Sequence, residues 1–417
     1  MSPASPAVYR RRRIVVGAAL VLFAVLATYI PVSLFAPVPA ATAAVAEVAP
    51  APSAATALST PAQGSSAIGI AEGSATKQLL GSSGSTESVP IASITKTITA
   101  LVVLDAKPIA DGGQGPDITI SDDDAAILQQ TIAVNGSWAS VFPGQVLSER
   151  QVIEIMLLES ANNYSVTLTN WAFGSTAAYL TAANAWLAEN GLSGTAVVDT
   201  SGLDPGSRST TADLLTLAAR VLADPVLAPI VGTKTDTLPQ LGEIENTNDL
   251  LGVAGIDGVK TGTTDEAGYC LLFSADYLVG TETVTLVGAV LGAGSEAELQ
   301  ASVVSLLQSA EGGFQTVDVV TQGQVLGSYT TEWGASSDVV AAETVSTAVW
   351  SQATFTPSVS LDPLTEASAG TVVGNARYEV AGISVAGEEL TVPLQLASDI
   401  AGPDAGWKLG NPGRLFG

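Results

Sequence analysis

The 417-residue sequence contains no histidine and a single cysteine, Cys270. Without histidine, a Ser-His-Asp triad, a Cys-His pair and any imidazole-bound metal are excluded, so acyl-transfer chemistry would need a different base. Without a second cysteine no internal disulfide can form, and stability has to come from packing. Basic residues are also scarce, 15 against 40 acidic ones, and the net charge of −25 argues against nucleic acid as a partner.

Arginines occupy positions 10–13, immediately before an uncharged apolar run over residues 14–35. As a helix this run would be roughly 33 Å long, enough to cross a bilayer. Because positive charge stays on the cytoplasmic side, the rest of the chain is expected outside the cytoplasm. A cleaved secretory signal is the alternative, since the Ala-rich residues 37–46 offer small-residue cleavage sites. We therefore expect a protein at the extracytoplasmic face of the cell membrane, or a secreted protein if the segment is cleaved.

Composition divides the chain into four segments. Residues 1–36 form a cytoplasmic tail and the membrane anchor or signal. Residues 37–65 are rich in Ala, Pro and Ser, which predicts a flexible linker. Residues 66–312 carry the helical and strand patterns of one large domain. Residues 313–417 show short alternating segments separated by turn residues, which predicts a small C-terminal all-β domain.

Hydrophobic periodicity in the large domain predicts both helices and strands. The predicted elements are helices that begin at Ser93 and at Ser148, helices over residues 176–190 and 210–222, a hairpin over residues 67–80, and strands over residues 269–273 and 284–291. The expected fold class is therefore α+β, with helices packed on a sheet whose strands come from both ends of the domain.

Three short motifs follow one another along this domain: Ser93-Ile94-Thr95-Lys96, Ser160-Ala161-Asn162 and Lys260-Thr261-Gly262. The third is the most specific, since only about 0.06 such matches are expected by chance in a chain of this composition. A second Ser-x-x-Lys, at residues 74–77, does not open a helix and is interpreted as a surface turn. Three motifs in this order, each in a suitable local structure, indicate a common site.

The motifs describe a serine nucleophile that is activated by lysine. Ser93 opens a helix, which places Lys96 one turn later and within reach of the Ser93 hydroxyl. The helix N-terminus and the nearby Lys260 disfavour the cationic form of Lys96. The pKa of Lys96 should therefore fall below ~10.4 and leave neutral amine to take the Ser93 proton. Ser160 can relay a proton to the leaving group, and the Asn162 amide can hydrogen-bond to a substrate.

Gly262 has no side chain to obstruct a ligand. On an edge strand it would let an extended peptide pair with the backbone around Thr261 and Thr263, as in strand addition. The backbone N–H of Ser93, at the start of its helix, lies where it could donate to an oxyanion. The pattern therefore predicts acyl transfer on a peptide substrate.

The sequence around these motifs resembles the low-molecular-mass penicillin-binding proteins, the serine-type D-alanyl-D-alanine carboxypeptidases. The resemblance covers residues 66–300 and is carried by the three motifs and by the stretches 91–104, 142–162, 201–213 and 255–270. It implies a penicillin-binding, β-lactamase-like fold with an antiparallel sheet, and no metal or organic cofactor. The partners that it implies are peptidoglycan stem peptides ending in D-Ala-D-Ala, and β-lactam antibiotics as covalent inhibitors.

The resemblance also implies roles for the motif residues. Ser93 would be the nucleophile and Lys96 the general base, with Ser160 as a third catalytic residue. The substrate-binding residues would be Asn162, Lys260, Thr261, Gly262 and Thr263, and the N–H groups of Ser93 and Thr263 would form the oxyanion hole.

Two short stretches depart from the family pattern. Residues 246–251 lack the arginine that helps many relatives to hold the terminal carboxylate of the substrate. Asn163-Tyr164 stands where relatives usually have an acidic residue and alanine. The first departure puts the affinity for the substrate, or the preference among substrates, in question.

The expected function is removal of the terminal D-Ala from peptidoglycan stem peptides through a Ser93 acyl-enzyme. The alternatives are a β-lactamase, a peptidoglycan endopeptidase or transpeptidase, and, least expected, an inactive wall-binding protein. A class A β-lactamase would carry a glutamate in a Glu-x-x-Leu-Asn setting between the second and third motifs. The glutamates in that interval are Glu189, Glu243 and Glu245, and none has this setting. The sequence therefore favours the carboxypeptidase.

Overall fold

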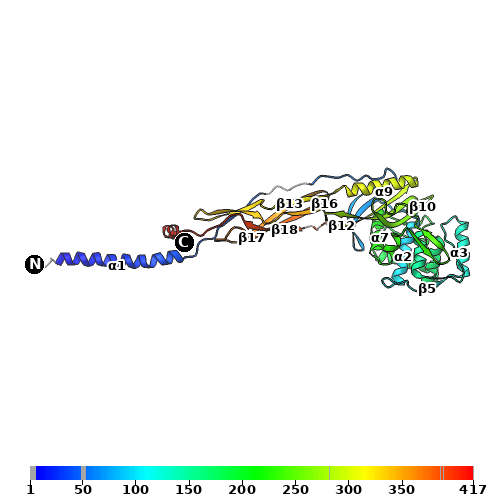
Figure 1. Cartoon of the computed structure of the whole chain (residues 1–417), viewed down its shortest axis with the longest axis horizontal. Helices are drawn as coiled ribbons and strands as arrows, with labels where there is room; N and C mark the ends of the chain where they lie inside the picture. The colour runs from blue at the N-terminus through cyan, green and yellow to red at the C-terminus, as the bar shows by residue number, and fades with distance from the viewer. Residues whose placement is uncertain (1–5, 48–52, 281, 386, 388, 417) are drawn as a thin grey trace. The chain divides into compact units, whose positions relative to one another are not determined.

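The computed structural model describes residues 6–47, 53–280, 282–385, 387 and 389–416. The chain forms two compact units. The main unit consists of Ala54–Thr316 and Ala348–Gln352, and the strand-rich unit consists of Met1–Ser53, Val317–Thr347 and Ala353–Gly417. Figure 1 colours both units by residue number.

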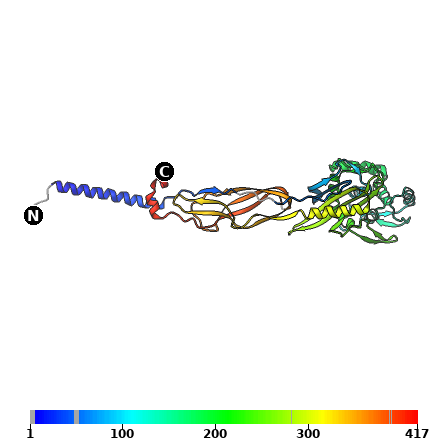
Figure 2. The same cartoon turned by 90° about the horizontal axis from the view of Figure 1, so that it is seen from above.

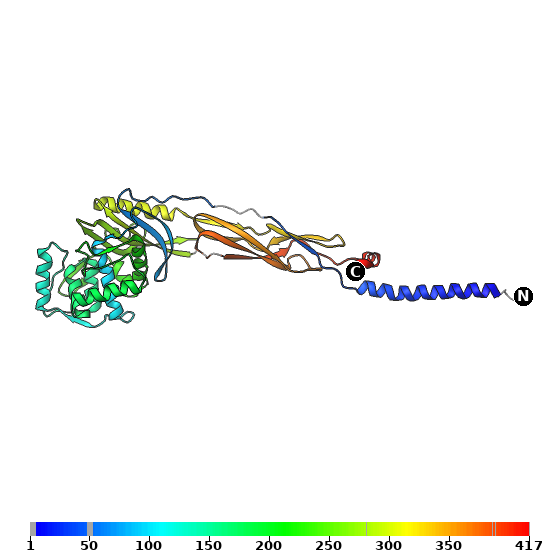
Figure 3. The same ribbon diagram turned by 180° about the vertical axis from the view of Figure 1, so that it is seen from behind.

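The core of the main unit is a five-stranded sheet in which neighbouring strands are antiparallel. Its strands, in spatial order, are β10 (Ile256–Thr264), β11 (Gly268–Val279), β12 (Glu282–Ala293), β2 (Ser65–Glu72) and β3 (Ala75–Ser83). The predicted hairpin and the strands from both ends of the domain are therefore confirmed. The two edges of the sheet are β10 and β3, the second strand of the hairpin that is blue in Figure 3.

Helices cover the sheet of the main unit. Figure 2 shows α9 (Glu296–Glu311) lying along the sheet, where it packs on β11 and β12. Helix α7 (Thr211–Ala223) packs on β12 and β2. The other helices are α2 (Thr95–Ala106), α3 (Asp122–Ala133), α4 (Glu149–Leu158), α5 (Asn162–Phe173), α6 (Thr176–Glu189) and α8 (Leu227–Val231). The helices expected over residues 176–190 and 210–222 correspond to α6 and α7, and the α+β fold class is confirmed.

Three short antiparallel pairs complete the described part of the main unit. They are β4 (Val89–Pro90) with β7 (Arg208–Ser209), β5 (Asp117–Thr119) with β6 (Val146–Ser148), and β8 (Thr235–Leu238) with β9 (Gly242–Glu245). The first pair ties the chain before Ser93 to the chain before α7.

Helix α2 is buried on all sides over most of its length. Its chain begins as a 3₁₀ turn over Ala92–Ile94 and continues as an α-helix from Thr95, so Ser93 lies in the turn that leads into the helix. The buried Thr99 on this helix is accommodated because its hydroxyl donates to the Thr200 carbonyl at 2.8 Å. Burial around Lys96 therefore follows from the position of α2 in the centre of the unit.

Local sequence also fixes where α4 begins and ends. The Ser148 hydroxyl accepts from the backbone N–H of Gln151, and the Gln151 side chain accepts from the N–H of Ser148, which forms an N-terminal cap at the predicted start of the helix. The helix ends at Leu158, and Ser160 then adopts a left-handed backbone conformation with φ 56°. This turn separates α4 from α5 and presents Ser160 at the junction.

The strand-rich unit contains a seven-stranded sheet. Its strands, in spatial order, are β1 (Thr42–Val45), β14 (Val325–Thr330), β15 (Ser336–Ala341), β18 (Glu389–Leu396), β17 (Val372–Ser384), β16 (Val345–Leu361) and β13 (Phe314–Val320). The apolar N-terminal run forms α1 (Pro6–Phe35), and among the described residues it is the one helix long and apolar enough to cross a membrane.

The structure differs from the flexible linker expected over residues 37–65. Thr42–Val45 forms β1 and pairs with β14, and the Ala41 N–H donates to the Leu364 carbonyl at 2.6 Å. Further along, the Thr56 N–H donates to the Ser351 hydroxyl at 2.8 Å. Small residues without a hydrophobic period can still join a sheet, because pairing uses backbone groups that every residue carries.

The boundaries at residues 65/66 and 312/313 also differ from the observed units. Ala348–Gln352 belongs to the main unit, where the Trp350 indole N–H donates to the Ala310 carbonyl at 2.7 Å. The expected C-terminal β domain also ends in two short helices, α10 (Ala405–Gly410) and α11 (Pro412–Phe416). Asp404 caps the first by accepting from the N–H of Trp407 at 2.7 Å. The segment is too short for its helical period to be recognised in the sequence.

Candidate active site

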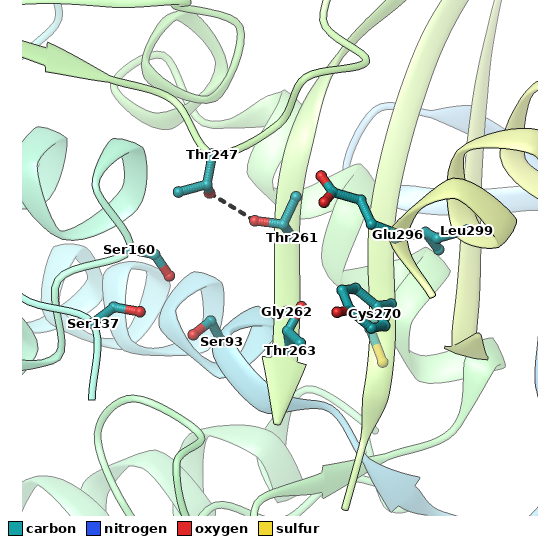
Figure 4. A pocket seen from close by; sticks show the side chains of 11 residues that line it. Ser93, Ser137, Ser160, Thr247, Thr261, Gly262, Thr263, Cys270, Glu296 and Leu299 are labelled. Atoms are coloured by element: carbon teal, nitrogen blue, oxygen red, sulfur yellow. Dashed lines mark hydrogen bonds between the residues drawn. The ribbon is translucent and has the colours of Figure 1, made fainter. Parts of the chain in front are cut away.

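A pocket of about 200 Å³ in the main unit collects residues from all three motifs. Its lining residues are Ser93, Ser137, Ser160, Thr247, Thr261, Gly262, Thr263, Tyr269, Cys270, Glu296 and Leu299. Figure 4 shows Ser93, Ser137 and Ser160 on one side of the strand that carries Thr261, and Glu296 and Leu299 on the other side. The pocket therefore borders an edge strand of the sheet.

The Ser93 hydroxyl oxygen lies 2.8 Å from the Nζ atom of Lys96. The same Nζ atom donates to the Ser201 carbonyl at 3.2 Å. Lys96 is completely buried, so its amine reaches the pocket only through Ser93. This contact joins a potential nucleophile directly to a potential base.

Burial lowers the pKa of Lys96 well below its ordinary value of 10.5. The positive charge of Lys260 lowers this pKa further, and the carboxylate of Asp199 opposes the change. Asp199 is itself engaged by its own loop, since it accepts from the hydroxyls of Ser201 at 2.9 Å and Ser207 at 2.5 Å. Lys96 is therefore suited to hold a neutral amine, the form that can accept a proton.

A second lysine forms a polar corner with two hydroxyls. Nζ of Lys260 lies 3.1 Å from the Thr247 hydroxyl and 3.2 Å from the Thr261 hydroxyl, and the two hydroxyls are 2.7 Å apart. Burial lowers the pKa of Lys260 to about 7. An ammonium flanked by two hydroxyl donors is suited to bind a carboxylate, and a bound anion would in turn favour the charged lysine.

The sequence did not single out Thr247 or Ser137 as site residues. Thr247 lies within residues 246–251, the stretch in which the arginine of many relatives is absent. The missing arginine was the one feature of the sequence that drew attention to this stretch. Thr247 itself could not be identified, because it is distant from Thr261 in the sequence and only the folded chain brings the two together. Ser137 belongs to no motif, but its backbone carbonyl accepts from the Asn162 N–H at 2.8 Å, which connects it to the second motif.

The turn that carries Ser93 and the strand that carries Gly262 approach closely. A Cβ atom added to Gly262 would lie 2.8 Å from the Ile91 carbonyl oxygen and 3.1 Å from the Ser93 nitrogen. Ala92, next to Ser93, has a left-handed backbone with φ 45°, a conformation that costs energy for a residue with a Cβ. Gly202 supports this turn, since a Cβ there would lie 1.8 Å from the Ala92 carbonyl oxygen. Absence of a side chain at Gly262 therefore permits the observed packing.

Three predicted site residues do not line the pocket. Lys96 and Lys260 lie buried behind it and reach it through Ser93, Thr247 and Thr261. Asn162, the first residue of α5, lines a separate cavity of about 280 Å³, and its side-chain oxygen is buried without a partner among the described residues. In the described ranges, no three Cys, Asp or Glu side chains gather into a potential metal site.

The other Ser-x-x-Lys sequence has a different setting. Ser74 lies in the turn between β2 and β3, and Lys77 forms an ion pair with Glu72 at 3.0 Å. Neither Ser74 nor Lys77 lines the pocket, and the segment forms the surface turn that was expected.

The fold and the pocket, in which a serine contacts a buried lysine beside an edge strand, agree with the comparison with protein families. Residues 54–295 match the model of the D-alanyl-D-alanine carboxypeptidase family, peptidase family S11. Because the match covers more than half of the chain, the protein belongs to this family.

Curated relatives are similar over part of their length. D-alanyl-D-alanine carboxypeptidase DacF of Bacillus subtilis (strain 168) is 28% identical over 257 residues, which are 60% of this chain and 63% of that protein. A D-alanyl-D-alanine endopeptidase of Escherichia coli (strain K12) is 30% identical over 209 residues, 48% of this chain and 62% of that protein. The chain thus spans less than two thirds of these curated relatives.

Solved structures show the same fold. The Streptomyces DD-transpeptidase is 25% identical with a TM-score of 0.52, covering 60% of this chain and 97% of that one. Penicillin binding protein 5 from Haemophilus influenzae is 20% identical with a TM-score of 0.56 and covers 85% of this chain and 99% of that one. The second likeness extends beyond the main unit.

The lowered pKa of Lys96 predicts a specific pH dependence. We expect the rate at which a fluorescent penicillin labels Ser93 to rise with pH through an apparent pKa well below 10.5, because neutral Lys96 is needed. Lys260→Gln removes one cause of the lowered pKa, so the rising limb should move to higher pH. The measurement is the second-order labelling rate from mildly acidic to alkaline pH.

Lys234→Gln is the matched control, since Lys234 is exposed and lies outside the pocket lining. Lys234→Gln should leave the pH profile of the labelling rate unchanged. An unchanged profile in Lys260→Gln would show that Lys260 does not set the pKa of the titrating group.

Proposed function

We propose that this protein is a serine-type D-Ala-D-Ala carboxypeptidase that removes the terminal D-Ala from peptidoglycan stem peptides. The observation that carries the proposal is the 2.8 Å contact between the Ser93 hydroxyl and Lys96, a buried lysine with a lowered pKa, at the wall of a pocket bordered by an edge strand. The family membership supports the same chemistry.

Substrate binding uses the free edge of β10. An extended peptide adds as a further strand beside Thr261, Gly262 and Thr263, with backbone hydrogen bonds supplying affinity. Its terminal carboxylate enters the corner formed by Lys260 and the hydroxyls of Thr261 and Thr247. This placement brings the preceding peptide bond to Ser93.

Acylation begins when the Ser93 oxygen attacks the carbonyl carbon of the penultimate D-Ala. The hydroxyl proton passes to the neutral amine of Lys96, and the N–H groups of Ser93 and Thr263 stabilise the oxyanion. The carbon–nitrogen bond then breaks, and the proton moves from Lys96 through the Ser160 hydroxyl to the departing amine. The products are free D-Ala and an ester on Ser93.

Deacylation reverses the roles with water as the nucleophile. Water attacks the ester carbon while Lys96 accepts one of its protons, and that proton returns to the Ser93 oxygen as the ester bond breaks. A β-lactam would acylate Ser93 by the same first step. Glu189, Glu243 and Glu245 do not line the pocket, so no carboxylate among them is available to drive hydrolysis of a penicillin ester. We therefore expect a long-lived penicillin adduct.

An endopeptidase that cleaves peptidoglycan cross-links is the second candidate. It is favoured by the carboxylate corner, where Thr247 contributes a neutral hydroxyl and no arginine is present in residues 246–251. A substrate with a larger leaving group makes other contacts as well, so a weaker carboxylate site would reduce its binding less. Comparing D-Ala release from a pentapeptide with cleavage of a cross-linked dimer distinguishes the two activities.

Ser93→Ala should abolish both penicillin labelling and D-Ala release from a pentapeptide, because the nucleophilic oxygen is lost. Ser74→Ala is the matched control and should retain both, since Ser74 lies in the β2–β3 turn. Labelling is read by gel fluorescence and D-Ala by an amino-acid oxidase assay. Labelling that persists in Ser93→Ala and vanishes in Ser74→Ala would overturn the assignment.

We further propose that α1 is retained as a membrane anchor, with the main unit and the sheet of the strand-rich unit outside the cytoplasm. The end of α1 is built into the strand-rich unit: the Tyr29 hydroxyl donates to the Leu409 carbonyl at 2.6 Å, and Lys408 donates to the Leu34 carbonyl at 2.9 Å. Seven residues after the end of α1 the chain enters the sheet as β1. Cleavage within residues 37–46 would break this continuous segment.

Mass analysis of the N-terminal peptide tests the retained anchor. Protein from the membrane pellet after alkaline carbonate extraction should yield peptides from before Phe35, because an apolar helix of this length stays in the bilayer. The matched comparison is the soluble fraction of the same cells. A mature N-terminus within residues 37–46, with the protein in the soluble fraction, would contradict the proposal.

A further inference from the structure

Glu296 lines the pocket but takes no part in the reaction steps described above. It is the first residue of α9 and is exposed. Figure 4 shows its side chain extending from α9 toward the strand of Thr261, on the opposite side from Ser93. Nε2 of Gln300 lies 3.5 Å from the Glu296 carboxylate, at the long limit of a hydrogen bond, so this contact leaves the carboxylate able to bind a ligand.

The wall around Glu296 lacks positive charge. The sequence has no lysine or arginine between Lys260 and Arg377, so β11, β12 and α9 contribute none. Lys260 is buried and faces the hydroxyls of Thr247 and Thr261. A cation in this part of the pocket would therefore find Glu296 without competition from a neighbouring basic side chain.

Strand geometry relates Glu296 to the leaving residue of the substrate. Side chains alternate between the two faces of a strand, so Gly262 faces the turn of Ser93 while Thr261 and Thr263 belong to the opposite face. A peptide paired with β10 alternates in the same way, so one of its side chains next to the scissile bond projects to that opposite face. Thr261 is part of the carboxylate corner, and Glu296 lines the pocket beside it, which places Glu296 near the residue that carries the carboxylate.

We propose that Glu296 selects leaving D-amino acids that bear a side-chain ammonium, such as D-lysine, over D-alanine. This inference rests on the proposed function, because it concerns the group released from the Ser93 site. The α-carboxylate still binds Lys260, and the side-chain ammonium pairs with Glu296. Since ion pairs at solvent-exposed positions are weak, we expect a preference of about three- to fivefold.

The test compares three substrates with the full-length chain in detergent. They are Nα,Nε-diacetyl-L-Lys-D-Ala peptides that end in D-Ala, in D-Lys, or in D-norleucine, whose side chain is apolar and of similar length. In the wild type, kcat/KM for D-Lys release should exceed that for D-Ala release, and it should exceed that for D-norleucine release by a ratio of about three to five. Glu296→Gln should reduce this ratio to near one, a fall of about three- to fivefold, and added salt should reduce it in the wild type.

Glu282→Gln is the matched control, because it makes the same charge change at the exposed start of β12. The opposite end of this strand, which leads to Glu296 and α9, is roughly 35 Å away. Glu282→Gln should leave the ratio unchanged. The inference would be overturned if the wild type showed no preference for D-Lys, or if its preference persisted in Glu296→Gln.

The two proposals fail in different ways. If D-Ala is released and Ser93 is labelled by penicillin but the ratio does not depend on Glu296, only the selectivity proposal is wrong. If no D-amino acid is released from any substrate and Ser93 is not labelled, the proposed function is wrong and the selectivity proposal falls with it.

Discussion

The active site depends on one buried contact, the 2.8 Å approach of the Ser93 hydroxyl to the amine of Lys96. An exposed lysine would be protonated at neutral pH and could not take a proton from serine. Burial within α2 removes the solvent that stabilises the ammonium, and the positive charge of Lys260 adds to the effect. In a chain without histidine, the fold itself thus prepares Lys96 for the role of base that we propose.

Other features of the main unit maintain this contact. Gly262 lets the edge strand β10 approach the turn of Ser93, and Gly202 leaves room for the carbonyl of Ala92. The left-handed conformations of Ala92 and Ser160 hold strained backbone in the two turns that carry Ser93 and Ser160. The pocket therefore requires the helices and the sheet together, since neither alone supplies both the nucleophile and the strand edge along which a peptide can bind.

Features set by local sequence could be predicted, and features set by long-range packing could not. The spacing of Ser93 and Lys96 and the cap at Ser148 depend on one helical turn each, and the structure has both. Thr247 was missed because only the folded chain brings it beside Thr261, and Asn162 lines a neighbouring cavity although its motif places it in the site. The strand Thr42–Val45 was missed because it pairs through backbone groups and carries no alternating pattern.

The account is tested most directly by trapping the acyl-enzyme from a peptide substrate. A thioester analogue of a stem peptide acylates faster than an amide, so rapid acid quenching during turnover should capture the intermediate for peptide mapping by mass spectrometry. We predict one peptidyl adduct, on Ser93, that disappears in Lys96→Arg because arginine cannot accept a proton at working pH. Turnover without a covalent adduct, or an adduct on Ser160 or Ser74, would contradict the central claim that Ser93 and neutral Lys96 form the reacting pair.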